Sequence, residues 1–191
     1  MKYLSIVFIL IFSISFCQTQ EATLYFKDGG EPISGYAEIY QGYKIKFKLE
    51  ENGEVSIWTG AVVKGITFHG FEFDRSFEYV LTQKFKRYPL LLELLTDGEV
   101  KLYADVLKPN FYVPVPLDGG LGVWRLPKST KYYVKRDSEL YASRLKGNFK
   151  KSIREYFGNC IGIEKRIKNH QFRWATLPEL VEYYNNYCVD F

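Results

Sequence analysis

The amino-acid sequence predicts an α+β fold, in which an N-terminal antiparallel β-barrel or sandwich-like sheet precedes a small C-terminal helical subdomain. Two patterns predict it. Between residues 22 and 81 apolar and polar side chains alternate, which is typical of half-buried strands. After residue 137 the apolar residues recur with the period of an α-helix. We divide the 191 residues into a signal peptide (1–17), a β-rich domain (18–136) and the helical subdomain (137–191).

Residues 1–16 have the pattern of an export signal. Lys2 is their only charge, and Leu4–Phe16 is apolar except for serines. This stretch is shorter than the roughly 20 apolar residues of a membrane-spanning helix, but it fits a signal-peptide core. We expect cleavage after Cys17 or Thr19, export to the periplasm, the outer membrane or the outside, and no transmembrane span in the mature chain. The alternative is a lipid anchor on Cys17, against which the bulky Phe16 argues.

The clearest strand of the β-rich domain is Tyr43–Leu49, where lysines alternate with apolar residues. Asn52-Gly53 has the residue types of a type I′ turn, because both central residues of that turn need positive φ. Glycine-containing turns also occur at 28–30, 41–42, 59–60 and 69–70. Short strands at this spacing predict a small antiparallel barrel or sandwich.

A second strand pair is expected over 90–96 and 99–105. The run 90–95 is rich in leucine, but Pro89 before it and Asp97-Gly98 after it limit it to the length of a strand. Segment 108–130 is rich in Pro and Gly and is interpreted as a long loop. Lys131–Arg136 is then a strand that returns to pair with the strand before the loop.

Four helical segments are expected in the helical subdomain. Their expected starts and apolar positions are Asp137 or Ser138 with Leu140, Tyr141 and Leu145; Asn148 with Phe149 and Ile153; Cys160 with Ile163 and Ile167; and Thr176 with Leu177, Leu180, Val181, Tyr184 and Cys188. Gly158 is expected to end the second segment. Thr176 and Glu179 have the spacing of a capping box.

Cys160 and Cys188 are expected to form a disulfide. Cys17 leaves with the signal, and two cysteines that remain in an oxidising compartment are more often paired than catalytic. Both lie on apolar helix faces. On the chain-entropy model the bond would contribute roughly 3.5 kcal/mol. The alternative is a pair of buried free thiols.

The sequence contains no catalytic, metal or cofactor motif that we recognise. It has only 2 His and 3 Cys, without the spacing of a metal-ligand set or of a nucleophile and its base. A phosphate-binding Gly-rich loop and a Gly-x-Ser-x-Gly motif are also absent. We therefore predict no catalytic residue and no cofactor.

Charge and aromatic residues indicate two candidate surfaces. Residues 131–173 hold 12 basic and 4 acidic side chains, so the helical segment should attract anions unless it is only a solubilising surface. The residues of this predicted basic face are Lys146, Lys150, Lys151, Arg154, Lys165, Arg166 and Lys168. In the long loop, Phe111, Tyr112 and Trp124 are either displayed to a protein or sugar ligand or packed against the barrel.

Short motifs along most of the mature chain resemble those of uncharacterised exported proteins of Bacteroidota such as flavobacteria. The matching segments are Leu24–Gly29 with Ser34-Gly35, Lys44–Lys48, Phe77–Val80, Leu91–Leu95 through Gly98 to Leu102-Tyr103, Tyr132–Lys135, Tyr156–Cys160 and Tyr183–Asn185. The resemblance implies an exported protein with a β-rich part and a helical tail. It implies no catalytic residue.

The leading functional hypothesis is a non-enzymatic envelope protein that binds another envelope protein, an anionic lipid or an acidic glycan. Nucleic acid is not expected as a partner of an exported protein. The alternative is an envelope enzyme, such as a glycan-directed hydrolase, that uses carboxylates of the β-rich domain.

Overall fold

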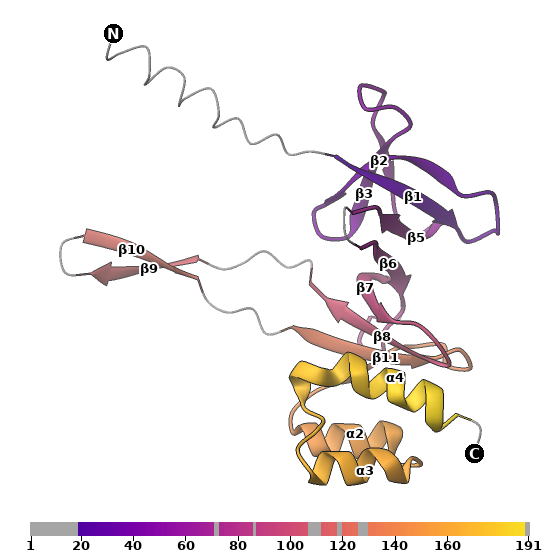
Figure 1. Ribbon diagram of the computed structural model, residues 1–191. Coiled ribbons are helices and arrows are strands. Elements are labelled where there is room, and N and C mark those ends of the chain that lie inside the picture. Colours follow the sequence, from indigo (N-terminus) through magenta and orange to yellow (C-terminus); the bar gives the residue numbers. More distant parts are fainter. Residues whose placement is uncertain are drawn as a thin grey trace.

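A computed structural model describes residues 19–70, 73–85, 87–106, 112–117, 120–125 and 130–189 (Figure 1). The strands of these residues are β1 (Gln20–Phe26), β2 (Ile33–Tyr40), β3 (Lys44–Lys48), β4 (Ser56–Trp58), β5 (Val63–Phe68), β6 (Arg75–Val80), β7 (Leu90–Thr96), β8 (Val100–Asp105), β9 (Tyr112–Leu117), β10 (Gly120–Arg125), β11 (Lys131–Arg136) and β12 (Ser143–Leu145). The helices are α2 (Phe149–Phe157), α3 (Ile161–Lys168), the short 3₁₀ helix η1 (Trp174–Thr176) and α4 (Leu177–Tyr187). The predicted α+β class is confirmed.

Ten strands form one antiparallel sheet in the order β12-β11-β8-β7-β6-β5-β1-β2-β3-β4. Of the two predicted forms, a barrel or a sandwich-like sheet, the barrel is wrong: in the described part of the chain β4 and β12 are edges that do not pair with each other. Both edge strands are three residues long. Short edges offer few unpaired backbone groups to another chain, so the sheet can stay open.

The N-terminal half of the sheet has its own apolar core. Residues from β1, β2, β3, β5 and β6 form this core together with Leu91 of β7. Within the predicted strand 43–49, Ile45 and Phe47 are buried, whereas Tyr43 and Leu49 at its ends are exposed. The alternation of polar and apolar side chains therefore predicted the buried residues correctly only where the segment pairs with other strands as β3.

The β2–β3 connection contains the positive-φ turn that was expected elsewhere. Gln41 and Gly42 have φ of 54° and 73°, and the Tyr43 N–H donates to the Tyr40 carbonyl. Asn52 and Gly53 do not have positive φ, so the type I′ turn predicted there is wrong. The β3–β4 connection is longer, and there the Gly53 N–H donates to the Glu50 carbonyl (2.9 Å).

The leucine-rich run 90–95 belongs to strand β7, as predicted. Leucines point to both sides of this central strand because both of its faces are covered: Leu91 joins the N-terminal core, while Leu92 joins a cluster with Val80, Tyr103 and Tyr133. That second cluster, which we call the central cluster, contains no residue of a helix. The face on which it lies carries the candidate site.

Strands β8 and β11 pair directly, so segment 108–130 is a long excursion between neighbouring strands, as predicted. Part of it is regular: β9 and β10 form a separate two-stranded ladder that lies apart from the main sheet (Figure 1). Pro114 and Pro116 lie two residues apart in β9, so their missing N–H groups fall on one edge. The ladder continues past both prolines, which places that edge away from β10.

The first predicted helical segment does not exist. Residues 143–145 instead form β12, which pairs with β11. Leu145 is buried against the helices, whereas Leu140 is 67% exposed. Asn148 does cap α2, since its side chain accepts a hydrogen bond from the Lys151 N–H (3.1 Å).

Helix α4 packs against β7 and β8, and α2 and α3 lie beyond it (Figure 1). Its predicted apolar stripe from Leu177 to Cys188 is buried as expected. The predicted capping box at Thr176 is wrong: the Thr176 hydroxyl accepts from the Arg173 N–H (3.1 Å) and so serves the preceding 3₁₀ turn. No helix in the described ranges is long and apolar enough to cross a membrane.

Asn185 of α4 holds the β7–β8 turn. Its side-chain carbonyl accepts from the Val100 N–H (2.9 Å), and its amide group donates to the carbonyls of Val100 (2.9 Å) and Asp97 (3.2 Å). Gly98 has φ of +140°, and a Cβ placed there would lie 2.4 Å from the Asn185 amide nitrogen. This glycine is therefore required both by its backbone and by the close approach of α4.

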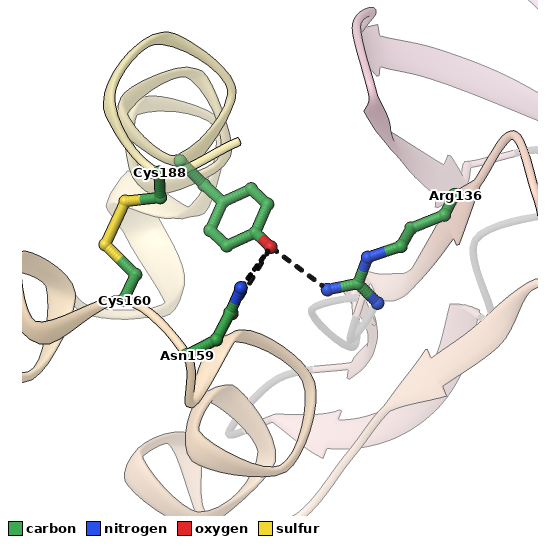
Figure 2. Close-up of a disulfide and its surroundings, with 5 residues drawn as sticks. Arg136, Asn159, Cys160 and Cys188 are labelled. Carbon is green, nitrogen blue, oxygen red and sulfur yellow. Dashed lines mark hydrogen bonds between the residues drawn. A yellow bond between two sulfur atoms is a disulfide. The ribbon is translucent and has the colours of Figure 1, made fainter. Parts of the chain in front are cut away.

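The predicted disulfide between Cys160 and Cys188 is present (Figure 2). It joins the residue before α3 to the residue after α4, and both cysteines are buried. Beside it the Tyr184 hydroxyl accepts hydrogen bonds from Asn159 (3.0 Å) and from Arg136 of β11 (3.3 Å). The helices, the disulfide and the end of the sheet thus form one connected core.

A candidate binding cleft

The predicted basic face lies on α2, α3 and the segment before α2, and much of its charge is already paired. Arg154 and Lys168 both contact Glu164, at 2.9 and 3.5 Å. Lys151 lies 3.9 Å from Glu155. Arg166 stacks over the Tyr183 ring, 4.4 Å from its centroid. Among the described residues only Lys146, Lys150 and Lys165 of the seven have no such contact.

The loop aromatics are only partly covered by the structure. Phe111 lies outside the described residues. Tyr112 begins β9, and Trp124 lies in β10 opposite Val113. The choice between displayed and packed side chains stays a prediction.

A cavity of about 1260 Å³ lies on the face of the sheet that carries no helices. We call it the main cleft. Its wall includes Val80 and Tyr103 of the central cluster and Leu90, which packs against that cluster. Its charged and aromatic lining residues are Lys27, Lys64, Glu78, Arg87, Lys101, Lys135, Asp137, Tyr43, Tyr79, Phe85, Tyr88 and Tyr103. The lining therefore contains five basic and two acidic side chains.

Two lysines of this cleft lie directly opposite each other in the β8–β11 ladder. Lys101 pairs in register with Lys135, so their side chains leave the same face of the sheet at neighbouring positions. Like charges at such positions repel each other. Lys101 is compensated by Asp97 (3.2 Å) and more distantly by Glu78 (4.0 Å). Lys135 has no ion pair among the described residues.

Glu78 is held by a hydroxyl as well as by charge. The Tyr103 hydroxyl donates to the Glu78 carboxylate at 2.6 Å. Burial raises the pKa of Tyr103, and the hydrogen bond to Glu78 raises it further. Burial likewise raises the pKa of Tyr79, whose hydroxyl donates to the Tyr43 carbonyl (2.6 Å). Both phenols therefore stay neutral hydrogen-bond donors at physiological pH, and the anions of the cleft are carboxylates.

The remaining basic side chains of the main cleft differ in whether they already have a polar partner. The Lys27 ammonium donates to the Gly60 carbonyl. Lys64 and Arg87 are exposed and, like Lys135, have no ion pair within the described residues. These three side chains can reach a ligand without breaking an existing contact.

A second cavity of about 700 Å³ adjoins the main cleft, because Tyr43, Phe85 and Leu90 line both. We call it the side cleft. Its charged lining residues are Lys84, Asp105, Lys131, Arg144 and Lys146. Lys146 was predicted from the sequence as part of the helical surface, and the structure places it here. The other predicted basic residues do not line either cleft.

Sequence reasoning missed both clefts because their residues come from distant segments. One signal was available: Lys101 and Lys135 each alternate with the buried residues that pack on the helices. Lysines at these positions must point to the opposite face. In the described part of the chain no three His, Cys, Asp or Glu residues gather as metal ligands.

The fold and the clefts define an open α+β sheet with a cationic, aromatic-lined face. The sequence matches no protein-family model, and no curated protein or solved structure is significantly similar to it.

Proposed function

We propose that this is an exported, non-enzymatic protein that binds an anionic component of the cell envelope in the main cleft. The observation that carries the proposal is the facing pair Lys101 and Lys135, whose repulsion an anionic ligand would relieve. The excess of five basic over two acidic lining residues supports it. The volume of about 1260 Å³ exceeds the roughly 300–1,000 Å³ of pockets for small ligands.

The main cleft is favoured over the predicted basic face for a physical reason. On the helices most cations already contact an anion or an aromatic ring, so fewer of them are available to a ligand. In a concave site with apolar walls the same charges act more strongly on a ligand.

The two surfaces can be separated by matched charge reversal. A Lys64/Arg87/Lys135→Glu variant should bind oligogalacturonate, a linear chain of uronic acids, at least about tenfold more weakly than the wild-type protein. A Lys150/Lys151/Arg154→Glu variant carries the same change of charge and should bind almost as well as the wild type. Calorimetric titration measures both, and circular dichroism checks that each variant is folded. Loss of binding in the helical variant alone would assign the ligand to the basic face instead.

The same experiment tests the enzymatic alternative. Glu78 and Asp137 both line the main cleft, which is the specific observation in favour of a glycan-directed hydrolase. If the oligomer is shortened during incubation, and a Glu78→Gln variant does not shorten it, the protein is an enzyme and the binding proposal is wrong.

Export rests on the apolar segment 4–16 and on the resemblance to exported Bacteroidota proteins, and the disulfide agrees with an oxidising compartment. Mass spectrometry of the protein from its native envelope should find a mature chain that begins at Gln18 or Gln20. A diacylglyceryl group on Cys17 would show the lipoprotein alternative, and an intact Met1 would contradict export by cleavage.

A further inference from the structure

We infer that the main and side clefts form one continuous groove for a linear acidic glycan, which spans both. The inference rests on the proposed function and specifies its ligand. Its starting point is geometric: the two cavities share Tyr43, Phe85 and Leu90, and both lie over the central cluster. A ligand in one cavity can therefore continue into the other without leaving the face of the sheet.

Both ends of this groove are cationic. The side cleft has four basic residues and one acidic residue, and the main cleft has five and two. In the side cleft Lys131 lies 3.9 Å from Asp105, whereas Lys84, Arg144 and Lys146 are exposed and have no ion pair among the described residues. Unpaired cations in both clefts fit repeated negative charges along one chain better than a single anion.

The junction between the two ends is aromatic. Tyr43 and Phe85 are 48% and 41% exposed there, although large aromatic side chains usually bury most of their surface. Lys84 lies over the Phe85 ring, with its nitrogen 5.3 Å from the centroid. Aromatic faces pack well against the apolar faces of sugar rings, and neighbouring cations then meet their carboxylates. A uronic-acid chain offers both groups in every unit, whereas a lipid headgroup offers only the charge.

The length of the ligand tests this inference. The dimer, tetramer and octamer of galacturonate should bind with increasing affinity, and the octamer should bind roughly tenfold or more tightly than the dimer because it occupies both clefts. A Lys84/Arg144/Lys146→Gln variant should lose most of this gain and still bind the dimer. A Lys150/Lys165/Lys168→Gln variant removes the same charge from the helices and should keep the gain.

Binding that is the same for all lengths would overturn the continuous groove while the proposed function stands. Binding to phosphatidylglycerol vesicles in place of the oligomers would overturn the glycan groove, while the proposed binding of an anionic envelope component stands. Absence of binding both to the oligomers at any length and to the vesicles would overturn both. A polyglutamate octamer separates a glycan from any polyanion: a Phe85→Ser substitution should weaken octagalacturonate several-fold more than polyglutamate. Equal weakening would show that the junction does not recognise sugar rings.

Discussion

Reduction of the Cys160–Cys188 disulfide is expected to lower the free energy of unfolding by about 3.5 kcal/mol. The bond joins residues 28 positions apart, so in its absence the unfolded chain gains the conformational freedom of that loop. The native contacts around it remain, because Tyr184 still bonds Asn159 and Arg136. We therefore expect a less stable protein that keeps its fold.

Urea unfolding with and without a reductant measures this difference. A Cys160→Ala/Cys188→Ala variant is the control, since a reductant should not change its unfolding curve. If mass spectrometry shows that the wild-type protein is fully reduced and the midpoint of its urea unfolding curve does not move, the disulfide does not stabilise the native state.

The second large effect is expected at Asn185. An Asn185→Leu substitution removes three hydrogen bonds and leaves the Val100 N–H and carbonyl without the partner that α4 supplies. An unsatisfied buried polar group costs about 1–3 kcal/mol, so we expect a loss of about 3 kcal/mol in the free energy of unfolding. Asn186→Leu is the matched control, because Asn186 is the next residue of the same helix and is exposed.

An Asn185→Asp substitution separates the hydrogen bond that Asn185 accepts from the two that it donates. The carboxylate can still accept from Val100, but it cannot donate to the carbonyls of Val100 and Asp97. Its stability should lie between those of the wild type and the leucine variant, and hydrogen exchange should show faster opening at the Val100 amide. Equal stability of the Asn185→Leu and Asn186→Leu variants would contradict this role.

Local patterns were sufficient to predict most elements of the fold. The α4 stripe, the β7 strand between Pro89 and Asp97-Gly98, and the cap at Asn148 depend on neighbouring residues, and all three are confirmed. The disulfide was also predictable, because its two cysteines lie at the ends of helices whose apolar faces were visible.

The wrong predictions involve partners that lie far away in the sequence. The spacing of Leu140, Tyr141 and Leu145 is helical. One edge of β11 is not paired with β8, however, and residues 143–145 pair with that edge as a strand instead. The Thr176 hydroxyl accepts a hydrogen bond from the Arg173 N–H instead of capping α4. Closure of the sheet depends on how many strands pair and how far each one bends, and neither quantity is encoded in one segment.

The candidate site was hidden for a related reason. The Lys101 and Lys135 pair exists only because β8 and β11 become neighbours across an excursion of more than twenty residues. Each lysine alone looks like the ordinary polar half of a strand. The charge count of residues 131–173 predicted that anions would be attracted, but it indicated the helices, whose cations the structure largely pairs.

The pairing of β8 with β11 also makes segment 108–130 structurally independent of the two strands that it connects. Asp105 and Lys131 are register partners, so the two points where the chain leaves and re-enters the sheet lie side by side. A segment whose ends are already together can be lengthened, shortened or exchanged without moving either strand. The fold thus offers a position where the chain can be altered while β8 and β11 stay paired.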